Sequence, residues 1–138
     1  MQTLFGKYLR KSPPKDSEVY ELKICKGTSL PLDSVQQNQI DALCQSERGS
    51  FYHKLTDPPV FTGMNTRFNL RRPFDCMCLV NVKAFVVVWF YRARQIKVFY
   101  KIPIEEFLRV KKALIGKRKS LTLDMVQKMG EPIFITIK

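Results

Sequence analysis

The sequence predicts one α/β domain in which helices flank a mixed β-sheet. Segments with strand patterns alternate along the chain with segments of helical periodicity, as in other α/β folds. Apolar residues make up 45% of the 138 residues, which is enough to form a core. The almost entirely apolar run at residues 84–91 is typical of a central strand covered on both faces. No repeat or change in composition marks a second domain, so residues 1–138 are expected to form a single domain.

The first two elements follow from periodicity. Residues 2–10 are expected to form an amphipathic helix, because their apolar side chains recur at helical spacing. Pro13 and Pro14 end that helix. Residues 18–26 then alternate at a period of two, which predicts a strand.

The second helix is expected to begin at Asp33, a suitable N-cap with Gln36 as its capping-box partner, and to end near residue 46. Residues 30–32 are expected to be a connector ahead of it. The remaining predicted elements are strands at residues 51–55, 75–81, 84–91, 96–102 and 133–137, and helices at 104–115 and 121–129.

The charge balance points to a polyanionic partner. The chain carries a formal net charge of +12, which favours nucleic acid first and an anionic membrane surface second. The apolar run at residues 84–91 is shorter than the about 20 residues that cross a bilayer, so no membrane-spanning segment is expected. The first residues lack the apolar stretch of a signal peptide, which predicts an intracellular, cytoplasmic protein, in the host cytoplasm if it is viral or from a phage.

The cysteines are expected to be reduced thiols in such a setting. Cys76 and Cys78 form a C-x-C that could join Cys25, Cys44 and His53 in a zinc site. The spacing matches no common zinc module, so small apolar packing residues are the favoured interpretation.

Two side chains of the strand at residues 18–26 suggest chemistry. Glu21 and Lys23 are two residues apart and therefore project from the same face. Metal-dependent nucleases place a metal-binding carboxylate beside a lysine that orients or activates water. Glutamate and lysine also occur on strands as a solvated outer face, so the pattern alone leaves both interpretations open.

Three further residues are candidates for the same site. Asp75 begins a predicted strand, where it either binds metal or accepts a hydrogen bond from the local backbone. Asp57 follows a strand end, either as a third carboxylate or as a turn residue before Pro58. Gln39 lies on the apolar side of the second helix, either as a satisfied core amide or facing an active site across the strand.

The motifs together resemble a known family. Residues 20–23 (Tyr-Glu-Leu-Lys), 29–32 (Ser-Leu-Pro-Leu) and 37–43 (Gln-Asn-Gln-Ile-Asp-Ala-Leu) are similar to the strand, connector and helix of RecU-type Holliday-junction resolvases and their phage relatives. These belong to the PD-(D/E)XK nuclease superfamily. Residues 73–75 (Pro-Phe-Asp) resemble its "PD" element, although here this element follows the E-x-K strand, so the order of the motifs is rearranged.

The resemblance implies a restriction-endonuclease-like sheet and a Mg²⁺-dependent reaction, with Mn²⁺ able to substitute and no small-molecule cofactor. Glu21 and Asp75 would be metal ligands, with help from the Leu22 carbonyl. Lys23 would be the catalytic lysine and Gln39 a helix residue near the site. Because a resolvase cuts two strands symmetrically, a homodimer is expected.

Basic residues flank the candidate site in the sequence, in positions suited to the phosphates of branched or duplex DNA. Phe68, which lies among three of them, either stacks on an unpaired base or belongs to the core. The candidate nucleic-acid-binding residues are Arg67, Arg71, Arg72, Arg92, Arg94, Lys117, Arg118 and Lys119.

The function expected from these observations is that of a metal-dependent, structure-selective DNA endonuclease, most simply a Holliday-junction resolvase that hydrolyses phosphodiester bonds. Two alternatives remain. One is a catalytically silent nucleic-acid-binding protein with a nuclease-like fold, and the other is a basic protein-interaction module.

Overall fold

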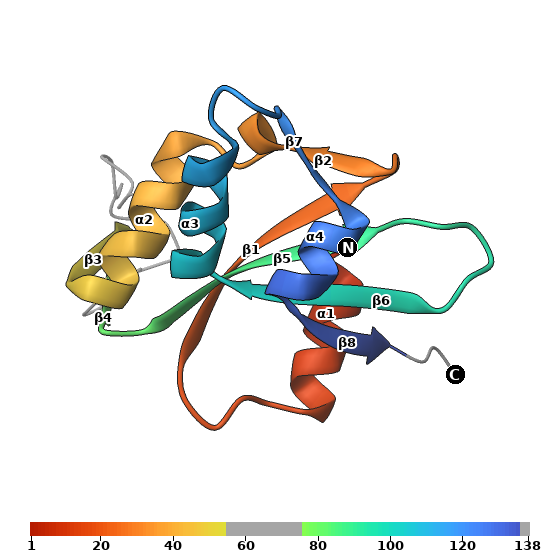
Figure 1. Ribbon diagram of the computed structural model, residues 1–138. Coiled ribbons are helices and arrows are strands. Elements are labelled where there is room, and N and C mark those ends of the chain that lie inside the picture. The colour runs from red at the N-terminus through yellow and green to blue at the C-terminus, as the bar shows by residue number, and fades with distance from the viewer. Residues whose placement is uncertain (55–75, 136–138) are drawn as a thin grey trace, which may run out of the picture.

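A four-stranded mixed sheet forms the centre of the computed structural model, which describes residues 1–54 and 76–135 (Figure 1). Its strands, in spatial order, are β1 (Glu18–Cys25), β5 (Lys83–Phe90), β6 (Lys97–Pro103) and β8 (Glu131–Ile135). The tight connection between β5 and β6 makes them antiparallel, and β6 and β8 are antiparallel as well. The long crossover from β1 allows it to pair with β5 in parallel. The predicted mixed sheet flanked by helices is therefore confirmed.

One face of the sheet is covered by α1 (Gln2–Lys11), which confirms the predicted amphipathic helix. Phe5 anchors this helix and is only 2% exposed. Its ring lies 5.1 Å from that of Tyr20 on β1 and 5.9 Å from that of Phe99 on β6. Helix α1 is thereby held to the sheet by aromatic contacts that span two strands.

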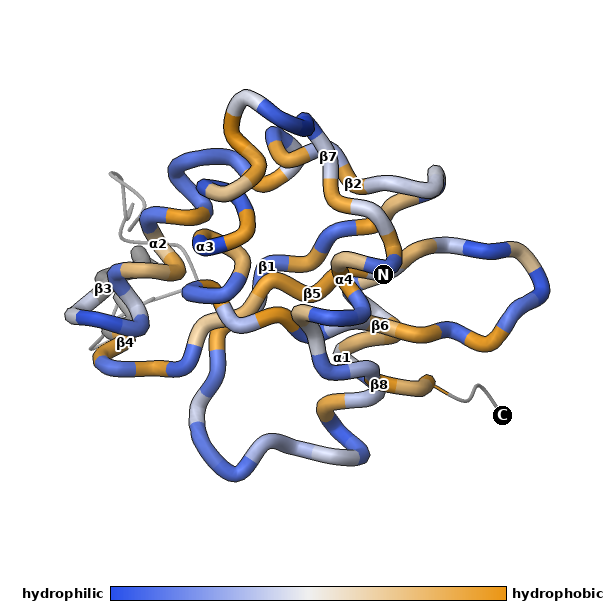
Figure 2. Tube along the Cα trace, viewed as in Figure 1, coloured by the Kyte–Doolittle hydropathy of each residue, from blue (hydrophilic) through white to orange (hydrophobic). Residues whose placement is uncertain are grey.

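The opposite face is covered by α2 (Gln37–Arg48), α3 (Ile104–Leu114) and α4 (Leu123–Met129). The central strand β5 supplies side chains to both layers, because successive residues of a strand point to opposite faces. Val86 and Val88 belong to the core beneath α2, α3 and α4, whereas Val87 and Trp89 belong to the core beneath α1. The long apolar run of β5 in Figure 2 is explained by this double burial.

Two small antiparallel sheets complete the fold. In one of them, β2 (Ser29–Pro31) pairs with β7 (Ser120–Thr122), and in the other β3 (Ser50–Lys54) pairs with β4 (Cys76–Val80). The β2–β7 pair corrects the expected connector at residues 30–32 and the expected start of a helix at residue 121. The physical reason is burial, since the paired Leu30 and Leu121 are 2% and 0% exposed.

The start of α2 also differs from the prediction, because Asp33 is not its N-cap. Asp33 lies in a single 3₁₀ turn, η1 (Leu32–Ser34), and Val35 then adopts an extended conformation. This extended backbone turns Val35 into the core, where it is 1% exposed, and a helix cannot continue through it. The helix begins at Gln37 with Gln36 as its N-cap, which places Gln39 in its first turn.

Candidate functional site

Glu21 and Lys23 project together from β1 toward α2, as their spacing predicts. Their neighbours of the same parity, Val19 and Cys25, contact the core beneath the three helices. The intervening Tyr20 contacts the core beneath α1. The Lys23 Nζ lies 3.0 Å from Oε1 of Glu21, so the two side chains form an ion pair.

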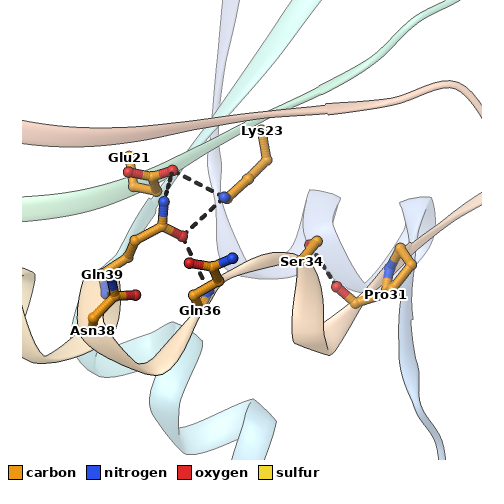
Figure 3. A network of polar contacts seen from close by, with 7 residues as sticks. All are labelled: Glu21, Lys23, Pro31, Ser34, Gln36, Asn38 and Gln39. Carbon is orange, nitrogen blue, oxygen red and sulfur yellow. Dashed lines mark hydrogen bonds and ion pairs between the residues drawn. The ribbon is translucent and has the colours of Figure 1, made fainter.

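Gln39 joins this pair from the first turn of α2 (Figure 3). Its Oε1 accepts a hydrogen bond of 2.9 Å from the Lys23 Nζ, and its Nε2 donates one of 2.9 Å to Oε1 of Glu21. The three side chains therefore form a closed triangle of polar contacts, which we call the Glu21–Lys23–Gln39 triad. Gln39 is thus a satisfied amide, and it lies against the strand that carries Glu21 and Lys23; that this place is an active site stays a prediction.

The backbone fixes the orientation of the Gln39 amide. Its Oε1 also accepts a hydrogen bond of 3.0 Å from the backbone N–H of Gln36, the N-cap of α2. Only an oxygen can accept from both Gln36 and the Lys23 ammonium, so the amide nitrogen must point to the Glu21 carboxylate. A helix-capping contact thus sets the hydrogen-bonding pattern of the triad.

The triad is partly enclosed but open to solvent. The side chain of Lys23 is 17% exposed and that of Glu21 is 25% exposed. A groove of about 330 Å³ adjoins it between β1 and α2, with Glu21 and Gln39 in its lining and apolar walls that include Val19 and Leu43. The first turn of α2, at the positive end of its helix dipole, lies next to the carboxylate. The triad is therefore accessible from solvent to a charged group of a substrate.

Within the described residues, Glu21 offers one carboxylate oxygen of the kind that a hard divalent cation such as Mg²⁺ binds. Both protein donors that contact Glu21 bind Oε1, and among the residues that the structure describes none donates to Oε2. A carboxylate oxygen without a protein donor is the kind of ligand that Mg²⁺ uses, often with only one or two protein carboxylates and several waters. Among the side chains that the structure describes, those of residues 1–50 and 79–135, no three acidic, histidine or cysteine groups gather into a metal cluster. Asp57 and Asp75, the other expected ligands, lie outside the described residues.

The described basic candidates lie in two loops. Arg92 and Arg94 belong to the connection between β5 and β6, and residues 117–119 belong to the connection between α3 and β7. The Arg92 Nη1 donates to the Gly27 carbonyl at 3.2 Å, which ties the first of these loops to the end of β1. Arg67, Arg71, Arg72 and Phe68 lie outside the described residues.

The two cysteines whose side chains the structure describes are not arranged for zinc. Cys25 belongs to the core and donates its S–H to the Ser29 carbonyl at 3.1 Å. Burial raises the pKa of the Cys44 thiol, which disfavours the thiolate that binds metal. Both observations agree with the packing interpretation, whereas the side chains of His53, Cys76 and Cys78 lie outside the description.

The part that Gln36 plays in the site was not predicted from the sequence. Gln36 was expected to complete a capping box with Asp33, whereas it is itself the N-cap and its N–H bonds to Gln39. The signal is present in the sequence, because glutamines three residues apart at the start of a helix form a capping-box pattern. The groove beside Glu21 has no comparable sequence signal.

Comparison of the chain with protein-family models, with curated proteins and with solved structures finds no match. In the part of the chain that the structure describes, none of the helices has the length and apolar character needed to cross a membrane.

Proposed function

We propose that this chain is a Mg²⁺-dependent endonuclease that acts on DNA, with a preference for branched substrates such as four-way junctions. The observation that carries the proposal is the Glu21–Lys23–Gln39 triad, in which a carboxylate, an ammonium and an amide lie within 3.0 Å of one another. The resemblance to RecU-type resolvases supports the same assignment, since it rests on the residues that form this triad.

Glu21 would hold the metal through its Oε2, together with the Leu22 carbonyl and with Asp75 and Asp57 as the carboxylates expected from the sequence. Bound Mg²⁺ supplies a Lewis acid for the phosphate and lowers the pKa of a bound water. The protein itself fixes the carboxylate, because Oε1 of Glu21 is held by both Lys23 and Gln39. A carboxylate fixed in this way loses less conformational entropy when it binds an ion.

Lys23 would orient the attacking water and stabilise the negative charge that develops on the phosphate. Its ammonium group is held at 2.9 Å from the Gln39 oxygen and 3.0 Å from the Glu21 oxygen, which leaves one N–H for the substrate. In the reaction, the water oxygen bonds to phosphorus as the bond to one bridging oxygen breaks. The water gives up a proton to solvent, and the leaving oxygen takes up a proton from solvent to become a hydroxyl group. Gln39 is a positioning residue, because it acts through Glu21 and Lys23.

The substrate assignment rests on charge. A net charge of +12 on 138 residues attracts polyanions and accelerates their association. A junction cutter must cleave two strands related by symmetry, so the proposal includes a homodimer.

The experiment is cleavage of labelled four-way junction, flap, duplex and single-stranded DNA with Mg²⁺ or Mn²⁺. We expect Glu21→Gln and Lys23→Met to abolish cleavage of the preferred substrate. The matched controls are Glu105→Gln and Lys128→Met, which remove the same charges from exposed ion pairs and should retain parental activity. Tight, salt-sensitive binding without cleavage by the parent would instead identify a silent nucleic-acid-binding protein.

A further inference from the structure

The end of the sheet beyond α1 carries an exposed aromatic surface. Ile24 at the end of β1 is 44% exposed, and Tyr91, directly after β5, is 42% exposed. Both lie on the α1 side of the sheet, because Ile24 pairs in register with Trp89 and Tyr91 is two residues further along. Helix α1 therefore covers only part of this face.

The Tyr91 ring packs against the ring of the buried Trp89. It makes an edge-to-face contact with Trp89 at 5.3 Å, and Trp89 stacks on Phe99 at 5.2 Å. The backbone N–H of Tyr91 also donates to the Cys25 carbonyl at 2.8 Å, which extends the attachment to β1. A flat, exposed ring with so little freedom loses little entropy when another ring stacks on it.

Cations border this surface on the side of the β5–β6 connection. Residues 91–97 contain three basic residues and no acidic one. The Lys97 Nζ lies 5.9 Å from the Trp89 ring centre, and Arg94 is exposed at the tip of the β5–β6 connection. Among the described residues, neither Arg94 nor Lys97 forms an ion pair. A rigid aromatic ring bordered by unpaired cations is complementary to a nucleotide, whose base stacks and whose phosphate is negative.

We propose that Tyr91, with Ile24 beside it and Arg94 and Lys97 at its border, forms a stacking platform for an unpaired base of single-stranded or branched DNA. Base pairs in an intact duplex hide their faces, so such a platform selects unpaired nucleotides. The inference rests on the proposed function for the identity of the ligand, and it names the substrate feature that would give the enzyme its structural selectivity.

The position of the platform relative to the triad fits this selectivity. Ile24 directly follows Lys23, and their side chains point to opposite faces of β1. Because β1 is an edge strand of the sheet, only one strand separates the two sites. When a DNA strand is cut beside Glu21, the unpaired part of the same strand can therefore lie on the platform, on the opposite face of β1.

The test uses the intact chain without divalent metal, so that binding is measured apart from cleavage. Trp89 is the only tryptophan and contacts Tyr91, so its fluorescence reports on the platform. We expect oligothymidylate of about 10 nucleotides to quench this emission, and Tyr91→Ala to weaken binding about 10-fold. Duplex binding should change little. Tyr91→Phe retains the ring and should bind like the parent, as should Ile115→Ser, which removes an exposed apolar side chain elsewhere.

A second variant tests the border of cations. Arg94 has a φ of 59°, a conformation that glycine adopts without strain, so Arg94→Gly removes the charge and keeps the turn. We expect the salt dependence of single-strand binding to fall by about 0.7 in the log–log slope, as for the loss of one phosphate contact.

Several results would overturn the platform. It is wrong if Tyr91→Ala binds oligothymidylate as tightly as the parent, or if Trp89 emission does not respond. It is also wrong if the parent dimerises without DNA and Tyr91→Ala is a monomer, because the surface would then join two copies. If single-strand binding depends on Tyr91 but the protein cleaves no DNA, the platform is retained and the nuclease is refuted. If the protein cleaves DNA and neither cleavage nor single-strand binding depends on Tyr91, the nuclease is retained and the platform is refuted.

Discussion

Replacing Gln39 with methionine measures how much the hydrogen bonds of the triad contribute to the free energy of unfolding, because the side chain keeps nearly the same size. Methionine has a similar length but no amide, so three hydrogen bonds are lost, to Glu21, Lys23 and the Gln36 N–H. Two charge-assisted bonds of at least about 1.5 kcal/mol each and one capping bond of about 1 kcal/mol together contribute about 4 kcal/mol. Water reaches Glu21, whose side chain is 25% exposed, and this lowers the expected loss to about 2 kcal/mol.

Urea unfolding measures this loss. With a slope of about 2 kcal/mol per molar urea, the midpoint should fall by about 1 M. The control is Gln37→Met in the same turn. Its exposed amide donates to Asp41 at 2.8 Å and to no other described residue, so its loss should change stability by less than about 0.5 kcal/mol. If the two variants unfold at the same urea concentration, the triad contributes no stability and its geometry does not order Glu21 and Lys23.

Three further predictions concern stability. Gly130→Ala should destabilise the fold by about 1–3 kcal/mol in the same urea assay, because the added carbon would lie 2.9 Å from a side-chain atom of β6. Gly6→Ala in α1 is the control: its added carbon meets nothing within 4 Å, so it should stabilise the fold by about 1 kcal/mol. Lys101→Met should lower the free energy of unfolding by about 3 kcal/mol, because the Glu18 carboxylate, which is only 10% exposed, then has no ion-pair partner. Adding Glu18→Gln should restore part of this loss in a double-mutant cycle. Burial and the hydrogen bond to Glu18 raise the pKa of Tyr20, so the folded state favours the neutral phenol. The free energy of unfolding should therefore fall as the pH rises above about 10. The urea midpoint of Tyr20→Phe should fall less than that of the parent over this pH range. An equal fall in both proteins would exclude Tyr20 as the cause.

Local periodicity was sufficient to predict the elements that carry the site. The alternation in β1 placed Glu21 and Lys23 on one face, because the side-chain direction in a strand depends only on parity. The apolar run of β5 predicted its burial on both faces, which the valines of that strand confirm. The mixed sheet flanked by helices follows from these patterns, whereas the metal and the reaction remain predictions.

Features that depend on contacts between distant segments were not predictable in this way. The β2–β7 pair joins two three-residue strands, and neither is long enough to produce an alternation that differs from a loop. The N-cap of α2 was misplaced because Asp33 is a good capping residue in isolation, and only the burial of Val35 excludes a helix there. Tertiary contacts overrode local preference in both cases.

The edge position of β1 also bears on the order in which the chain folds. The contact between Glu21 and Gln39 closes a loop of 18 residues, whereas the first register pair of β1 and β5 joins residues 18 and 83. Loop-closure entropy makes the longer connection more costly by about 1 kcal/mol. The triad can therefore form from a local unit of β1 and α2 before the parallel strands pair. In the native state, conversely, β1 can open from β5 while β5, β6 and β8 stay paired, so amide hydrogen exchange in β1 would report the lifetime of the site separately from that of the whole fold.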